Sequence, residues 1–157
     1  MLIPREIYQQ IVEYAAIPTV DIIFLDKDKK VLLWLRTNEP LQWSYYIPGW
    51  RIEKGETIIQ AALRKAKEET SLIIDETKLQ FVGTYDDIFD SSAFIWLSTH
   101  CIPSIFVYRL DEHEVPHIHC DSQHSEMKFF AYNDVLLHPH LQSRLAHIQS
   151  VYHIFNS

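Results

Sequence analysis

Two adjacent glutamates, Glu68 and Glu69, stand near the end of a helical pattern that follows a short loop containing glycine. At about 100° per residue, Lys65, Glu68 and Glu69 project from one face of a helix. Carboxylates that project together behind a loop of exposed backbone groups offer the oxygen ligands that Mg²⁺ prefers. The same spacing also fits a plainer interpretation, in which Arg64–Glu68 and Lys65–Glu69 are i, i+4 ion pairs on a solvated helix face. The residues alone therefore predict either a cation site or two ion pairs.

The local sequence predicts where this helix begins and which side it buries. Gly55 breaks the chain before Thr57, and Gln60 stands three residues after Thr57, as in a capping box. The apolar stripe with helical spacing, which we expect to face a core, consists of Ile59, Ala62, Leu63 and Ala66.

The stretch 48–72, PGWRIEKGETIIQAALRKAKEETSL, resembles the Nudix box, in which a glycine loop and a Glu precede Arg-Glu-hydrophobic-x-Glu-Glu-x-Gly-hydrophobic. The positions that match it in register are Glu56, Arg64, Ala66, Glu68, Glu69 and Leu72. Three positions depart from it, because Trp50 replaces the first Gly, Lys65 replaces a Glu, and Ser71 replaces the closing Gly. The resemblance implies one Nudix-like domain over 1–157, with the box-like loop and helix at 49–72, folded as an α/β/α sandwich with a mixed sheet between helices.

Composition limits the classes of function. At 157 residues, with 47% hydrophobic and 13% aromatic residues, the chain can bury a core as one globular domain. The formal net charge of -7 disfavours a general binder of nucleic acid or of membrane surfaces. Cys101 and Cys120 are too few for a disulfide framework, and no segment has the length of a signal peptide core or a membrane span. We therefore expect a cytoplasmic protein that binds neither nucleic acid nor membrane.

The rest of the chain predicts alternating strands and helices. Apolar and β-branched runs predict strands at 19–25, 31–35, 45–47, 79–85, 100–110 and 127–132. Helical signals predict helices at 4–15, after Asn133 and from Pro139 onward. Pro103 indicates a bulge or an edge position in its strand. Residues 86–99 and 111–126 are expected to be long loops, and loops of that length often cover a site.

Within the Nudix superfamily, the chain resembles the GDP-mannose mannosyl hydrolases over nearly its whole length. The segments with counterparts in that branch are VDIIFL, LRTNEP, YYIPGWRIEKGET, LSTH and DSQHSE. That branch also lacks the box Glu at the position of Lys65, and a site for several metals is hard to build without it. The resemblance implies an enzyme that hydrolyses GDP-mannose, or a related GDP-hexose, at sugar C1 to give GDP and free sugar.

The resemblance also implies a base and a metal site. It makes His124 the general base that activates water, a role that suits a group with a pKa near neutrality. One Mg²⁺ per site, for which Mn²⁺ can substitute, would be held by the Gly49 carbonyl, Glu69 and Gln123. Glu68 adds a further carboxylate that a metal could use.

The resemblance further implies a set of substrate contacts and a homodimer. Arg36 and Arg51 would hold the diphosphate as it leaves. Asp21 would contact the mannose, Tyr8 would lie near the base, and Arg64 would order the loop or contact the leaving group.

Two other functions stay open at this level. A conventional Nudix pyrophosphatase would attack phosphorus with Glu68 and Glu69, and would release GMP and sugar 1-phosphate. A module that binds a nucleotide sugar without turnover is favoured by Trp50, Lys65 and Cys101, the last of which replaces a Tyr thought to reach the β-phosphate in the resembled branch.

Overall fold

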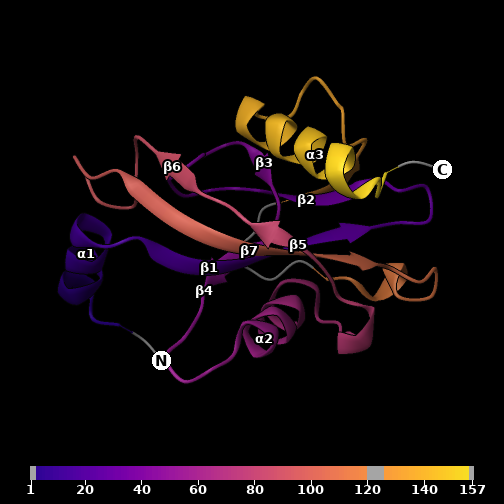
Figure 1. Ribbon diagram of the computed structural model, residues 1–157, viewed down its shortest axis with the longest axis horizontal. Coiled ribbons are helices and arrows are strands. Elements are labelled where there is room, and N and C mark those ends of the chain that lie inside the picture. Colours follow the sequence, from indigo (N-terminus) through magenta and orange to yellow (C-terminus); the bar gives the residue numbers. More distant parts are fainter. Residues whose placement is uncertain (1–2, 120–125, 156–157) are drawn as a thin grey trace.

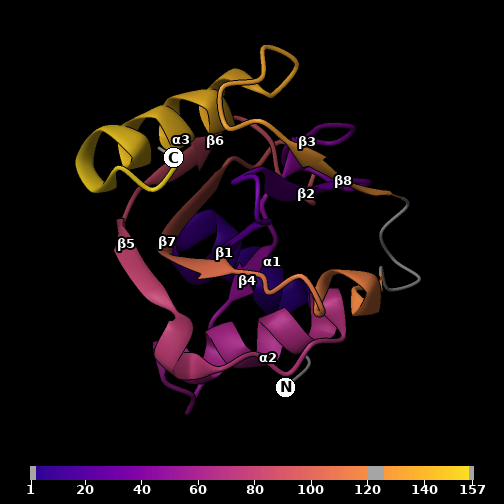
Figure 2. The same ribbon diagram turned by 90° about the vertical axis from the view of Figure 1, so that its right-hand side faces the viewer.

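The computed structural model of the chain, which describes residues 3–119 and 126–155, is a mixed sheet between helices (Figure 1). Helix α2 (Ile58–Thr70) covers one face of the sheet and α3 (Pro139–Tyr152) covers the other. The view along the strands shows these three layers, with α1 (Arg5–Tyr14) across one end (Figure 2). The α/β/α sandwich that we predicted is therefore confirmed.

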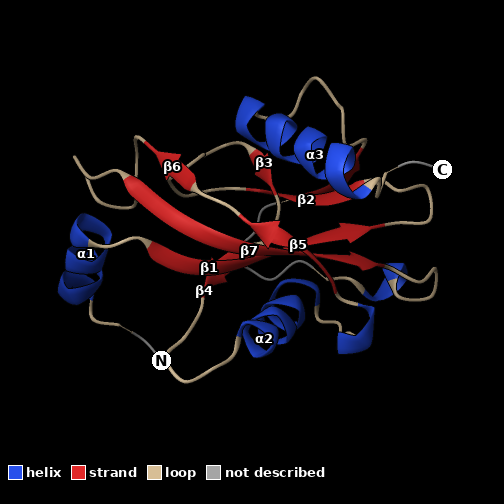
Figure 3. Ribbon diagram, viewed as in Figure 1, coloured by secondary structure: helices blue, strands red, loops and turns tan. Residues whose placement is uncertain are grey.

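The centre of the sheet is a parallel pair of long strands. β1 (Ile17–Leu25) pairs with β7 (Thr99–Arg109) in one continuous register. The other strands are β2 (Val31–Leu35), β3 (Tyr45–Tyr46), β4 (Gly49–Arg51), β5 (Gln80–Thr84), β6 (Asp87–Phe89) and β8 (Met127–Phe130). The strand order is β3-β2-β1-β7-β5, and in addition β4 pairs with β1, β6 with β7 and β8 with β2 (Figure 3). Apart from β1–β7, these pairs are antiparallel.

Helix α2 has the ends that its sequence predicts. Thr57 Oγ1 accepts from the Gln60 amide at 3.2 Å, and the Gln60 side chain accepts from the Thr57 amide at 2.8 Å, which is a capping box. Ser71 ends the helix with φ 64°, a left-handed conformation that glycine adopts at lower cost. Two short 3₁₀ turns, Glu76–Lys78 and Val115–His117, complete the helical segments. None of the helices in the described ranges combines the length and apolar character that a bilayer span requires.

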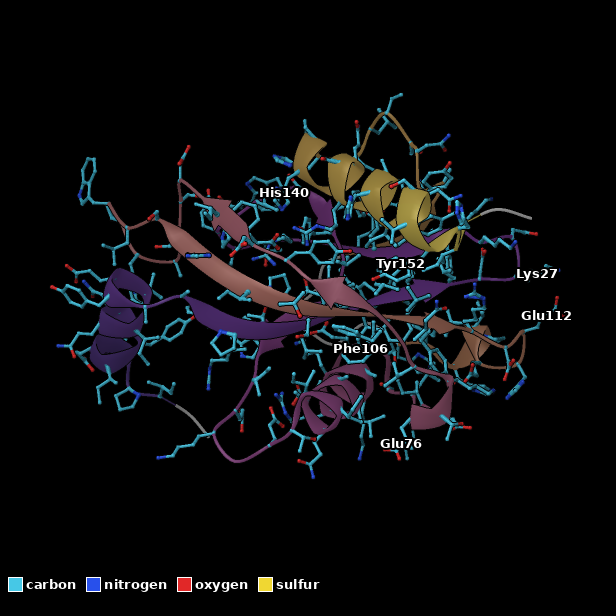
Figure 4. All side chains as sticks on the ribbon, viewed as in Figure 1. Lys27, Glu76, Phe106, Glu112, His140 and Tyr152 are labelled. Atoms are coloured by element: carbon cyan, nitrogen blue, oxygen red, sulfur yellow. The ribbon has the colours of Figure 1, made fainter. Side chains whose placement is uncertain are left out.

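Two apolar layers hold the helices to the sheet. Alternate residues of β1 point to opposite faces, so Ile23 packs on the α3 side and Ile22 on the α2 side. Phe106 of β7 belongs to the α2 layer and lies between that helix and the sheet (Figure 4). By the same alternation, Asp21 lies on the face that Ile23 shares, and it is buried although it is acidic.

Three local predictions were wrong or incomplete. The segment after Asn133 forms turns instead of a helix, because the Asp134 carboxylate accepts from the Leu136 amide and competes with helical bonding. Residues 86–99 are not entirely a loop, since β6 pairs with the start of β7. Pro103 lies in a central strand, where the partner of β7 changes from β6 to β5, so its missing N–H interrupts no ladder.

Replacement of Leu145 by alanine should destabilise the fold strongly. Its side chain is fully buried between α3 and the sheet, and a Leu→Ala change at such a position costs roughly 2–5 kcal/mol. Leu136→Ala is the matched control, because that leucine is 82% exposed and should change the free energy of unfolding by less than about 0.5 kcal/mol. Urea unfolding of both variants measures the difference. Equal losses would contradict the packing of α3 described above.

Candidate functional site

The loop before α2 is fixed by one arginine. Arg64 donates to both carboxylate oxygens of Glu56, from Nε at 3.1 Å and from Nη2 at 2.6 Å. Glu56 also accepts from the Glu53 amide at 2.7 Å, and the bonds from Arg64 hold the pKa of Glu56 below its ordinary value. Arg64 further contacts Glu68 at 3.2 Å and the Arg51 carbonyl at 3.4 Å. Arg64 therefore joins the loop, β4 and the helix, and these contacts favour the first of the two roles that the resemblance implies for it.

The second ion pair of α2 is buried. Lys65 and Glu69, one turn apart, are 8% and 2% exposed, and the Lys65 Nζ contacts Glu69 Oε1. The same Nζ lies 3.9 Å from Glu68 Oε2 and 5.5 Å from the centre of the Trp50 ring. Both predicted i, i+4 pairs thus form, but the Lys65–Glu69 pair lies inside the protein instead of on a solvated face.

Gly49 brings the loop against Asp21. The two residues are opposite each other in the antiparallel pair of β4 and β1. A Cβ at Gly49 would overlap the Asp21 carboxylate and would lie 2.9 Å from the Val20 carbonyl oxygen. Glycine is therefore required here for close approach, at a position where its φ is not unusual.

Asp21 is a buried acid with a shifted pKa. Burial, followed by repulsion from Asp87, raises the pKa of Asp21 to about 8, although Arg144, Arg36 and Lys65 oppose this shift. At neutral pH the side chain is therefore mostly protonated, and it can donate a hydrogen bond as well as accept one.

Arg36 and Cys101 interact electrostatically with Asp21, and Tyr8 packs with Cys101 in one apolar cluster. Burial, together with the charge of Asp21, raises the pKa of the Cys101 thiol to about 11, while Arg36 opposes that rise. Burial and Cys101 raise the pKa of Tyr8, and Arg51 opposes it. Arg36 donates from Nε to the Pro40 carbonyl at 2.6 Å, which orients its guanidinium. The Asp21 cluster, as we call this group, contains Tyr8, Asp21, Arg36, Arg51 and Cys101.

Sequence reasoning missed a second buried network beside this cluster. Asp87 of β6 accepts from Arg144 at 2.6 Å and from Tyr46 at 3.5 Å, and its oxygen lies 2.9 Å from His140 Nε2. Burial alone would raise the pKa of Asp87, but the bonds from His140 and Arg144 outweigh it and lower the pKa. Figure 4 labels His140 at the start of α3, next to β6. The signal in the sequence was Arg144, a charged residue on the buried face of the last helix.

Two predicted residues, Gln123 and His124, lie outside the described residues. The other predicted metal ligands are Gly49, Glu68 and Glu69. The carboxylates of Glu68 and Glu69 are engaged by Arg64 and Lys65, and the described ranges contain no group of three or more acidic, histidine or cysteine side chains placed to hold a metal. In this arrangement the described donors do not form a ligand set for Mg²⁺.

The sequence of this chain is similar to those of known Nudix proteins. The model of the NUDIX domain matches residues 16–150. The low-salt glycan biosynthesis protein Agl8 of Haloferax volcanii is 31% identical over 144 residues, which cover 91% of this chain and 88% of that protein. An ADP-ribose pyrophosphatase of Methanocaldococcus jannaschii is 45% identical over 49 residues, 31% of this chain and 29% of that protein.

A solved structure shows the same fold. The NUDIX domain of Shewanella oneidensis NrtR, complexed with ADP ribose, superposes with a TM-score of 0.61 at 20% identity. The match covers 95% of this chain and 100% of that one. With the family match over most of its length, the chain belongs to the NUDIX domain family, and its identity as a Nudix hydrolase is supported.

Proposed function

We propose that this protein hydrolyses GDP-mannose or a related GDP-hexose at sugar C1 and releases GDP and the free sugar. The observation that carries the proposal is the buried contact between Lys65 and Glu69. Attack at phosphorus uses carboxylates to hold metal ions, and here the Glu68 and Glu69 carboxylates are engaged by cationic side chains. Attack at carbon needs fewer metal-binding carboxylates. The full-length similarity to a glycan biosynthesis protein also favours a sugar substrate.

The proposed reaction is a displacement with inversion. The water oxygen forms a bond to C1 as the bond between C1 and the β-phosphate oxygen breaks, and that oxygen keeps the electron pair. His124 takes the proton from water on the far face of the sugar, as an inverting mechanism requires. Arg36 and Arg51 stabilise the negative charge that grows on the departing GDP.

Asp21 has a separate role in this proposal. Its protonated carboxyl donates a hydrogen bond to a hydroxyl group of the sugar, which helps to place C1 between water and diphosphate. Gly49 serves this role indirectly, because a larger residue would displace the Asp21 side chain. Tyr8 belongs to the same cluster, and the centre of its ring lies 5.8 Å from the centre of the Phe94 ring.

The Nudix pyrophosphatase reaction is the second candidate. Glu68 is 48% exposed and can turn from Arg64 toward a metal and a phosphate. The local similarity to an ADP-ribose pyrophosphatase favours this candidate. Binding without turnover is the third. The homodimer expected from the resemblance and the cytoplasmic location expected from the composition remain predictions beside all three.

Incubation with GDP-mannose in ¹⁸O-labelled water distinguishes the candidates. We expect GDP and mannose, with the label in mannose, because water attacks carbon. GMP and mannose 1-phosphate, with the label in a phosphate, would show attack at phosphorus instead. If GDP-mannose binds but no product forms, either with EDTA or with Mg²⁺ present, the result would favour a module that binds the nucleotide sugar without turnover. Mass spectrometry of the separated products gives the answer directly.

His124→Ala should lower kcat by a factor of about 10²–10⁴, the usual contribution of a general base. His113→Ala is the matched control, because that histidine belongs to the same long segment and lies on a turn between β7 and the 3₁₀ turn at Val115–His117. Glu68→Gln should have little effect if carbon is attacked. A larger loss from Glu68→Gln than from His124→Ala would contradict the proposal.

Substrate binding should weaken as the pH rises through about 8, because Asp21 then loses the proton that it donates. KM for GDP-mannose between pH 6.5 and 9 measures this, and Asp21→Asn, which keeps a donor but cannot ionise, should remove the rise. Asp90→Asn, on an exposed residue, should keep the wild-type profile.

The raised pKa of Asp21 should also change the stability of the protein in the absence of substrate. The native state holds this proton up to about pH 8, whereas the ordinary value is 3.8, so the free energy of unfolding should fall as the pH rises between these values. Asp21→Asn should reduce that fall. A wild-type stability that rises through this range in parallel with the variant would show that Asp21 is ionised in the native state.

A further inference from the structure

The two box positions that depart from the family pattern near Glu69 contact each other. Trp50 stands in place of a glycine and Lys65 in place of a glutamate, and the Lys65 Nζ lies 5.5 Å from the centre of the Trp50 ring. The face of an indole ring attracts a cation at this distance. The two departures therefore form one contact, in which Lys65 supplies the cation and Trp50 supplies the ring face that attracts it.

The carboxylates of α2 complete this arrangement. Lys65 Nζ contacts Glu69 Oε1 and lies 3.9 Å from Glu68 Oε2, while Glu68 also pairs with Arg64 at 3.2 Å. Lys65 is only 8% exposed, and lysine side chains are seldom buried to this degree unless they are paired with acidic groups. The ammonium group is thus enclosed by two carboxylates and one aromatic face.

A divalent cation at Glu69 would have to displace this ammonium group. Mg²⁺ and Mn²⁺ bind carboxylate oxygens directly at short distances, and Lys65 already contacts Glu69 Oε1. If the lysine remained beside the ion, the two like charges would repel each other across a partly buried site. If it moved away, the side chain would lose both Glu69 and the Trp50 ring.

We propose that the Lys65 ammonium group is the resident cation of the box helix and excludes a divalent metal from Glu69. The charge of Glu69 is then neutralised by the chain itself, and the loop and helix keep their geometry without a metal. The proposal concerns the same region as the proposed function, but it does not depend on which bond of a substrate breaks.

Titration of the protein with Mn²⁺ alone tests the proposal, with free Mn²⁺ followed by electron paramagnetic resonance. The wild type should show no saturable site up to roughly millimolar Mn²⁺. Lys65→Met, which keeps the length of the side chain without its charge, should bind Mn²⁺ at least about tenfold more tightly, an effect typical of groups next to metal ligands. Lys67→Met is the matched control, because it removes one charge from an exposed position of the same helix and should leave Mn²⁺ binding unchanged.

Three results would overturn the proposal. The first is saturable Mn²⁺ binding to the wild type that matches the affinity of Lys65→Met. The second is a folded Lys65→Met variant that gains no affinity, since the lysine would then not be what excludes the metal. The third is an equal gain from Lys67→Met, which would indicate a general effect of net charge.

A second variant covers the case in which Lys65→Met does not fold. Lys65→Glu supplies a third carboxylate, and its repulsion from Glu69 should lower Tm in EDTA. Added Mn²⁺ should then raise Tm in this variant and not in the wild type, because ligands that bind the native state stabilise it. A Tm that is indifferent to Mn²⁺ in Lys65→Glu would contradict the proposal. None of these measurements uses a nucleotide sugar, so failure of the proposed function would leave them interpretable.

Discussion

Burial of acidic side chains without loss of the fold is the constraint on which the rest of this structure depends. In the part of the chain that the structure describes, three carboxylates are buried, and each is accommodated differently. Glu69 has the ammonium group of Lys65, and Asp87 has the guanidinium of Arg144 together with His140. Asp21 is within the influence of several cations, yet burial dominates and its pKa rises to about 8. At Asp87, contact with cations thus outweighs the effect of burial on the pKa, whereas at Asp21 burial dominates and favours the protonated form.

The central strand β1 places these acids relative to one another. Its alternation turns Asp21 to the α3 side and Ile22 to the α2 side, while its pairing with β4 brings Gly49 against Asp21. The loop that follows β4 leads into α2, so the acid on one face and the helix on the other are fixed by the same short strand pair. The influence of Lys65 on the pKa of Asp21 follows from this connection. The close approach of Gly49 to Asp21 therefore links the Asp21 side of the sheet to the α2 side.

Much of the fold could be predicted because its signals are local. The capping box at Thr57, the apolar stripe of α2 and the runs that form β1 and β2 depend on residues close in sequence, and the structure confirms them. The Asp87 network was missed because it joins β6, β3 and α3, which only the tertiary fold brings together. The burial of Lys65 and Glu69 was missed for a similar reason, since spacing gives the pair but not the sheet that covers it.

The geometry of the box does not require all the residues that usually compose it. Arg64 ties Glu56 to the helix, the loop amide of Glu53 is satisfied by Glu56, and the capping box begins α2 at Thr57. All of these contacts use backbone amides or side chains of the protein itself. The ammonium group of Lys65 adds a further cation, which contacts Glu69 and lies over the Trp50 ring. Because these contacts do not use a metal ion, substitutions at the box positions Trp50, Lys65 and Ser71 can alter the chemistry of the site while the loop and helix remain in place.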